Sequence, residues 1–124
     1  MHEMGIVSGI LTASVDSARR MDAVRINEIR VRIGELTEIV DEALHFAFEA
    51  LSPGTLAEGA VLIVERVSGR SECVECGASF NHGRFDVACP ACESYFCTLV
   101  EGRELEIESI DVDLPESKEG GDET

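Results

Sequence analysis

Four cysteines, arranged as two Cys-x-x-Cys pairs, are the residues of this 124-residue chain best suited to chemistry. Twelve residues separate the pairs, which consist of Cys73 with Cys76 and of Cys89 with Cys92. Thiolates at this spacing can converge on one tetrahedral Zn(II) ion. Because four sulfurs complete the coordination shell, the pattern predicts a structural zinc site and no metal-bound water for catalysis. Gly77 supplies a permissive backbone after the first pair, whereas Glu93 follows the second, so the second turn must close without that help.

Disulfides, buried free thiols and an iron site are the alternatives to zinc. No secretory signal is evident, and the longest purely apolar run, residues 60–64, is too short for a bilayer, so we expect a cytoplasmic protein with reduced thiols. Iron in a rubredoxin-like site would use the same four sulfurs and stays open. The fifth cysteine, Cys97, lies in an apolar stretch and is predicted to be a small buried hydrophobe.

Charge and motifs narrow the possible functions. The chain has 25 acidic and 10 basic residues, for a formal net charge of −15. Nucleic-acid binding needs a basic face, which the cysteine-rich region lacks, and we expect neither a nucleic-acid nor a membrane partner. Nothing resembles a nucleophile with its base, a phosphate-binding loop or a dinucleotide fingerprint, so an enzyme is not expected.

The amino terminus offers a second set of metal donors. In Met1-His2-Glu3, the α-amine, the His2 amide and the His2 imidazole can bind one ion through fused chelate rings, a planar nitrogen set that favours Ni(II) or Cu(II). By itself the signal is weak, because a histidine at this position is more often simply solvated. No metal role is predicted for His45, expected to be a partly buried helix residue, or for His82, expected in a solvated turn.

The elements that must position these residues follow from hydrophobic periodicity. Apolar side chains at helical spacing predict a helix over residues 4–18 and another over residues 36–51, with Thr37 as its N-cap. Strands are predicted over residues 24–33, with a bulge near residues 27–28 where the alternation changes phase, over the well-buried residues 60–67, and over residues 104–112.

These elements predict an α+β fold in which a three-stranded sheet carries two helices on one face. A small zinc-ribbon-like domain with the four cysteines, residues 69–104, would be inserted into it. The main domain would then comprise residues 1–68 and 105–115. Residues 116–124 contain no large apolar side chain and are predicted to form a disordered acidic tail.

The chain resembles the HypA family of nickel-incorporation proteins in nickel-iron (NiFe) hydrogenase maturation. The resemblance rests on five features of the sequence. They are the opening Met-His-Glu, the Val-x-Ile-x-x-Ile-x-Val-x-Ile-Gly strand, Glu-Ala-Leu and Phe-Ala-Phe in the second helix, the cysteine pairs, and a final Gly-Arg-Glu-Leu-Glu-Ile strand. It covers residues 1 to about 114. Glu93 departs from the family, which usually has glycine after the second pair.

The resemblance implies a metallochaperone that binds Ni(II) at the amino terminus, cooperates with a HypB-like GTPase and delivers the ion to the hydrogenase large subunit; some relatives also support urease. His2 would be the essential nickel ligand, Glu3 would add a backbone or outer contact, and the Met1 amine is a candidate donor. The structural zinc ligands would be Cys73, Cys76, Cys89 and Cys92. A zinc-ribbon adaptor between proteins and a rubredoxin-like electron carrier are the alternatives.

Overall fold

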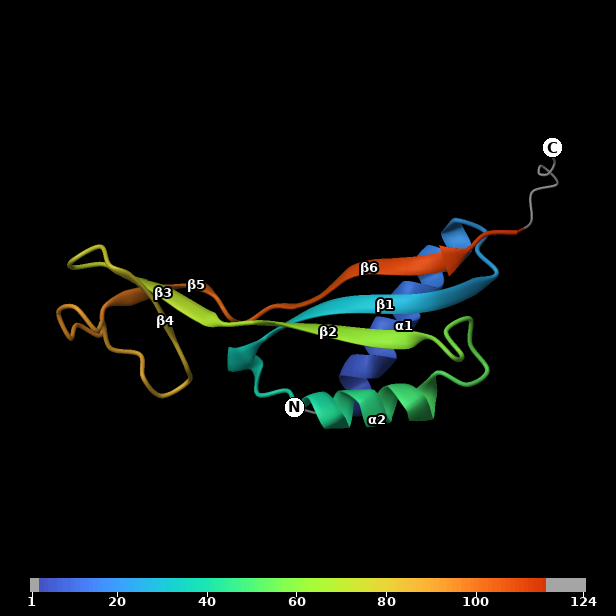
Figure 1. Cartoon of the computed structure of the whole chain (residues 1–124), viewed down its shortest axis with the longest axis horizontal. Coiled ribbons are helices and arrows are strands. Elements are labelled where there is room, and N and C mark those ends of the chain that lie inside the picture. Colours follow the sequence, from blue (N-terminus) through green and yellow to red (C-terminus); the bar gives the residue numbers. More distant parts are fainter. Residues whose placement is uncertain (1–2, 116–124) are drawn as a thin grey trace. The chain divides into compact units, whose positions relative to one another are not determined.

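The computed structural model describes residues 3–115, which form two helices, one 3-10 turn and six strands in two compact units (Figure 1). The first unit contains the chain up to Val31, residues Val40–Ile63 and the chain from Ile107 onward; the second contains Arg32–Ile39 and Val64–Glu106. The elements are α1 (Glu3–Arg20), β1 (Arg25–Gly34), the 3-10 turn η1 (Glu35–Thr37), α2 (Asp41–Leu51), β2 (Val61–Val67), β3 (Gly69–Cys73), β4 (Ser79–His82), β5 (Cys97–Glu101) and β6 (Leu105–Asp113).

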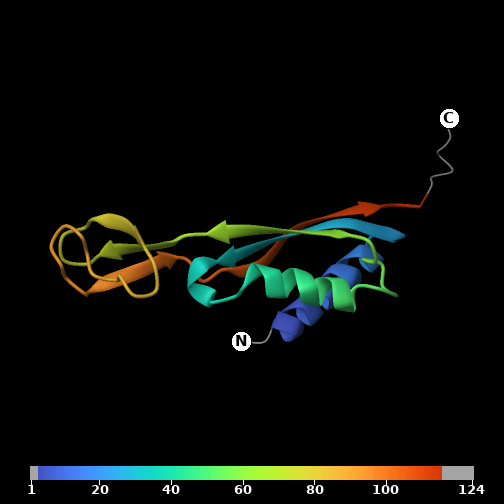
Figure 2. The ribbon, with the colours of Figure 1, turned by 60° about the horizontal axis from the view of Figure 1, so that its bottom comes forward.

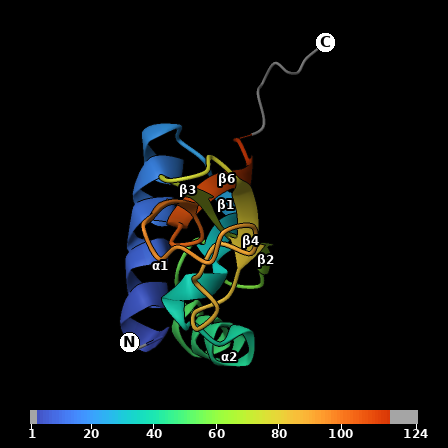
Figure 3. The same ribbon diagram turned by 90° about the vertical axis from the view of Figure 1, so that its left-hand side faces the viewer.

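The predicted α+β fold is confirmed. One three-stranded sheet has the order β2-β1-β6, so the last strand joins the first, and α1 and α2 lie on one side of it (Figure 2). The two helices are neighbours (Figure 3). Neither helix within residues 3–115 is long and apolar enough to cross a membrane. The predicted tail, residues 116–124, lies outside the described residues.

The core of the first unit joins the apolar stripe of α1 to the inner face of β1. Val7, Ile10, Leu11 and Ala18 of α1 are buried, as their helical spacing predicts. In β1 the buried positions change phase between Ile26 and Ile29, where the sequence predicted it. Burial of each large aliphatic side chain contributes about 1.5–3 kcal/mol to the stability of this unit.

The predicted start of the second helix is wrong. Instead of one helix from residue 36, the chain forms the turn η1, passes through a left-handed Glu38 (φ 65°) and begins α2 at Asp41. Thr37 does not cap α2, because its hydroxyl donates to the Gly34 carbonyl at 2.7 Å. The apolar spacing continues across the break, so periodicity alone does not reveal a single left-handed residue.

The edge strand β2 is less buried than predicted, and β6, for which the sequence predicted only an alternation with a change of phase, is more exposed still. In β2 only Leu62 and Val67 are buried, and Val61 is 57 % exposed. No residue of β6 is buried. Helices cover one face of this sheet and β1 occupies its centre, so the flanking strands keep half of their side chains toward solvent.

The second unit contains a sheet that the sequence did not predict. Its order is β4-β3-β5, and both pairings are antiparallel, with an irregularity between Arg70 and Ser71. Three glycines allow the backbone segments of this unit to pass closely: a Cβ on Gly34 would overlap the Gly102 carbonyl, and one on Gly69 would lie 2.5 Å from the His82 oxygen. Gly102 also has a positive φ (127°). Larger residues at these positions would separate the segments.

Candidate metal centre

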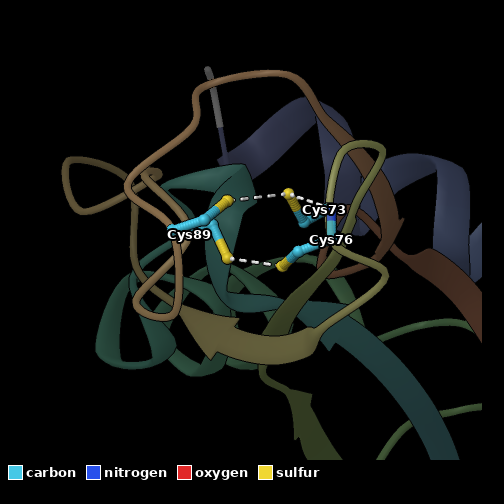
Figure 4. Close-up of side chains that lie close together, drawn as sticks. Cys73, Cys76 and Cys89 are labelled. Carbon is cyan, nitrogen blue, oxygen red and sulfur yellow. Dashed lines mark hydrogen bonds between the residues drawn. The ribbon is translucent and has the colours of Figure 1, made fainter.

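All four paired cysteines converge in the second unit. Their sulfur atoms lie within 4.8 Å of one another and come from two separate turns, as Figure 4 shows for the labelled Cys73, Cys76 and Cys89. The Cys73 and Cys92 sulfurs are 3.5 Å apart, and those of Cys76 and Cys89 are 3.6 Å apart. Each of these two short separations therefore joins a cysteine of the first turn to a cysteine of the second.

The first turn follows directly from β3, which ends at Cys73. The Cys73 amide donates to the Ala78 carbonyl at 2.8 Å, and the Gly77 amide donates back to the Cys73 carbonyl at 2.9 Å. Gly77 has a φ of 80°, which a glycine adopts without steric penalty. The Cys76 amide points at the Cys73 sulfur from 3.4 Å. Such a turn presents two sulfurs and one amide to the same point.

The second turn repeats the first without a glycine. The Cys89 amide donates to the Ser94 carbonyl at 2.9 Å, and the Glu93 amide donates to the Cys89 carbonyl at 2.7 Å. Glu93 stands four residues after Cys89, as Gly77 stands after Cys73, and it adopts the same left-handed conformation with a φ of 65°. Comparison of the two spacings could have predicted this conformation for Glu93 from the sequence.

Burial follows the same pattern in both turns. The first cysteine of each pair is buried, with Cys73 3 % and Cys89 0 % exposed, whereas Cys76 and Cys92 are exposed. An ion among these sulfurs would therefore sit at the surface of the unit, with half of its shell covered.

Three of the four clustered thiols have shifted pKa values. A backbone hydrogen bond from Cys76 lowers the pKa of Cys73 to about 6. The Ser94 amide acts to lower the pKa of Cys92, but the sulfur of Cys73 and burial act against it and raise that pKa to about 12. Cys76 also has a raised pKa: the backbone of Ala78 opposes the rise, and the sulfur of Cys89 drives it. The backbone of the first turn therefore favours the thiolate form of Cys73.

The residues fit a tetrahedral zinc ion. Zn–S bonds of about 2.3 Å in a regular tetrahedron place the sulfurs about 3.8 Å apart. The shortest sulfur separations, 3.5 and 3.6 Å, are close to this value. A bound zinc ion would cross-link the two turns. It would not be catalytic, since the four sulfurs leave no position for a reacting water.

Cys97 is not part of the cluster within the described residues. Its sulfur lies 3.7 Å from the Ser94 carbonyl oxygen, and burial raises the pKa of its thiol. The side chain is half-buried, somewhat more exposed than the buried hydrophobe that the sequence predicted.

The two remaining histidines differ from the predictions in their exposure, although His45 lies in a helix as predicted. His82 is half-buried, with its Nε2 atom 2.7 Å from the Ser71 hydroxyl and its Nδ1 atom 2.7 Å from the Gly83 carbonyl. His45 is exposed on α2 rather than partly buried. The pairing of β3 with β4, which the sequence did not predict, brings Ser71 and His82 together.

Of the predicted nickel residues, Glu3 alone lies within the described chain, and Met1 and His2 lie outside it. Glu3 begins α1, where an acidic side chain complements the helix dipole. Its Oε2 atom accepts a long hydrogen bond of 3.4 Å from the amide of Val40, the residue before α2. The first turn of α1 is thereby linked to the start of α2.

The family model and the most similar curated proteins all carry the same family name. A family model described as "Hydrogenase/urease nickel incorporation, metallochaperone, hypA" matches residues 1–112. A protein from Geobacter sulfurreducens named "Hydrogenase maturation factor HypA" is 41 % identical over 113 residues, which cover 91 % of this chain and all of the relative. A protein of the same name from Chlorobium luteolum is also 41 % identical, covering 91 % of this chain and 97 % of the relative.

Solved structures show the same fold. The solution structure of the Ni metallochaperone HypA from Helicobacter pylori superposes with a TM-score of 0.67 at 24 % identity, covering 92 % of this chain and 99 % of the other. A second solution structure, of a HypA protein, also gives a TM-score of 0.67, at 25 % identity, covering 90 % of this chain and 96 % of the other.

Proposed function

Because this chain belongs to the HypA family of hydrogenase and urease nickel-incorporation metallochaperones, we propose that it delivers Ni(II) to the large subunit of a nickel-iron hydrogenase. The observation that carries the proposal is the extent of the family match, which begins at residue 1 and includes the Met-His-Glu terminus. A HypB-like GTPase would be its partner, urease maturation proteins are further candidate partners, and the cytoplasm would be its compartment.

The nickel site would consist of Met1, His2 and Glu3. The α-amine and the amide and imidazole nitrogens of His2 form a nitrogen-rich donor set of the kind that Ni(II) prefers. Glu3 supports this placement, because its bond to the Val40 amide anchors the residue next to His2. A chain end exchanges donors one at a time, which suits an ion that must be released to a partner.

The four cysteines would hold a permanent Zn(II) ion whose role is structural. Support comes from the sulfur separations and from the absence of a free position in a four-sulfur shell. The zinc-binding part would correspond to residues 69–104, and the nickel-binding part to residues 1–68 and 105–115. With neither ion activating water, the protein would have no turnover chemistry of its own.

Titration of Ni(II) into tag-free protein tests the proposal. We expect one Ni(II) bound by the native chain and binding lost in two altered proteins, His2→Ala and a version extended by two residues before Met1. His45→Ala is the matched control, since this histidine is exposed and its loss should leave nickel binding unchanged. Zinc content should be full in all four proteins. Nickel binding retained by both altered proteins would move the site to the cysteine cluster or the acidic surface.

The same titration has a defined pH dependence. The amine (pKa about 7.7–8.0) and the imidazole (about 6.5) must lose protons to bind the ion. Nickel affinity should therefore fall steeply as the pH drops below about 7. A flat response between pH 6 and 8 would count against this donor set.

A further inference from the structure

A cavity of about 430 Å³ lies entirely within the second unit, and none of the four clustered cysteines lines it. Its volume is in the range of small-molecule sites. The side chains that give it chemical character are Glu38, His82, Arg84, Phe85, Tyr95 and Arg103.

The cavity is locally basic in a chain with a net charge of −15. Arg84 and Arg103 line it together with a single carboxylate, Glu38, whose oxygen lies 3.3 Å from Arg84. Arg103 is exposed and has no acidic side chain within salt-bridge distance among residues 3–115, whereas Arg32 and Arg70 of the same unit each hold a glutamate within 3.0 Å. The cavity therefore keeps one guanidinium available for an external anion.

Glu38 shows that a carboxylate fits beside Arg84. Its backbone is left-handed, with a φ of 65°, a conformation that costs a residue other than glycine about 1 kcal/mol or more. In this conformation a Glu38 carboxylate oxygen lies 3.3 Å from Arg84. An incoming carboxylate would meet Arg103 directly and would compete with Glu38 for Arg84.

Aromatic side chains flank these charges. Phe85 and Tyr95 are 86 % and 74 % exposed, and the Arg84 guanidinium lies 4.8 Å from the centre of the Phe85 ring. The His82 ring is fixed by its bonds to Ser71 and Gly83. The wall beside the arginines thus offers flat apolar surface that a ligand could cover.

We propose that this cavity binds the carboxylate of a singly charged organic anion with a flat apolar body, through Arg103 and, by competition with Glu38, through Arg84. Arginine forks match carboxylate and phosphate geometry. Two guanidiniums and one glutamate leave a formal charge of +1, which one carboxylate neutralises, and the exposed Phe85 and Tyr95 rings favour an organic anion over inorganic phosphate. The carboxylate could come from a free aromatic acid or from a peptide that ends in an aromatic residue. The site requires no nickel and is independent of the function proposed above.

Amide NMR spectra of the zinc-loaded full chain test this proposal, with benzoate, benzamide, inorganic phosphate and N-acetyl-Gly-Phe as probes. We expect saturable benzoate shifts at residues 82–85 and 95–103 and none with neutral benzamide. Arg103→Gln should weaken benzoate binding about tenfold, and Glu38→Gln, which removes the competing charge, should strengthen it several-fold. Arg25→Gln, an exposed arginine in the first unit, is the control for charge loss and should change nothing.

Each further outcome has a defined meaning. Tighter binding of N-acetyl-Gly-Phe than of benzoate would identify a peptide end as the source, and the reverse order a free acid; both support the site. Unsaturable shifts, equal binding of benzamide, tighter binding of phosphate, or unchanged affinity in Arg103→Gln with the spectrum and zinc content intact would overturn it. Because Glu38→Gln is expected to act in the opposite direction, a loss of binding from damage to the fold cannot imitate the full pattern.

Discussion

The two cysteine turns have the same backbone hydrogen bonds but different residues at the position where the chain turns left-handed. Gly77 occupies it in the first turn and Glu93 in the second, with φ values of 80° and 65°. In both turns this residue donates its amide to the carbonyl of the first cysteine, Cys73 or Cys89. Only the first turn has the residue that this conformation favours.

The second turn therefore adopts its left-handed conformation against the preference of the residue that occupies it. A left-handed residue other than glycine costs about 1–2 kcal/mol, and it persists when the surroundings determine its geometry. Those surroundings are the bonds of Cys89 with Ser94 and Glu93 and the need for its sulfur to meet the others. Zinc binding, worth about 10–16 kcal/mol in small modules, is large enough to offset the strain.

The largest effect should follow removal of a buried sulfur from either turn. Cys73→Ser and Cys89→Ser should each lower zinc affinity on the order of a hundredfold, since each removes one of four thiolate ligands. Competition with a chromogenic chelator measures this loss. Cys97→Ser is the control and should keep full zinc affinity, because Cys97 lies outside the cluster. If one of the two substitutions proved harmless, the two turns would not share an ion.

Zinc affinity should fall as the pH falls, because every ligand thiol must lose its proton to bind. The pKa of Cys73, about 6, means that this thiol is already ionised at pH 7.5, whereas Cys92, with a pKa of about 12, is still protonated. We therefore expect zinc binding at pH 7.5 to release at most three protons, and the number to rise below pH 6, where Cys73 is also protonated. Calorimetry in buffers of different ionisation enthalpy counts them; four protons released at pH 7.5 would contradict the low pKa of Cys73.

Gly77→Ala should destabilise the zinc-loaded second unit by about 1 kcal/mol. A Cβ at Gly77 would meet no atom within 4 Å, so the effect isolates the backbone conformation from any steric clash. Chemical denaturation followed by amide exchange within β3 and β4 measures it. An unchanged stability would mean that the first turn does not need its glycine.

Glu93→Gly should have the smallest effect and the opposite sign. Glycine relieves the left-handed strain but adds freedom to the unfolded chain, so we expect a gain of about 0.5 kcal/mol. Glu75→Gly, in the first turn at a residue without a positive φ, should be destabilising and serves as the control. A loss of stability in Glu93→Gly would show that the glutamate side chain contributes more than its backbone strain costs.

Features carried by short stretches of the chain were predictable. The Cys-x-x-Cys spacing indicated two metal-binding turns, and the stripe from Val7 to Ala18 indicated α1, because each depends on neighbours within one or two turns of the chain. The start of α2 was not predictable, because one left-handed residue, Glu38, interrupts an otherwise continuous apolar pattern. Short strands such as β4 have too few residues to show the alternation of apolar and polar side chains by which a strand is predicted.

Residue identity and spacing were enough to predict the four-cysteine cluster, the family and the α+β class. Strand pairing and tertiary contacts, in contrast, decided that His82 bonds to Ser71 and that Arg103 lines a cavity with Arg84. Both features bring together residues from separate segments of the chain, and such contacts form only once the strands have paired.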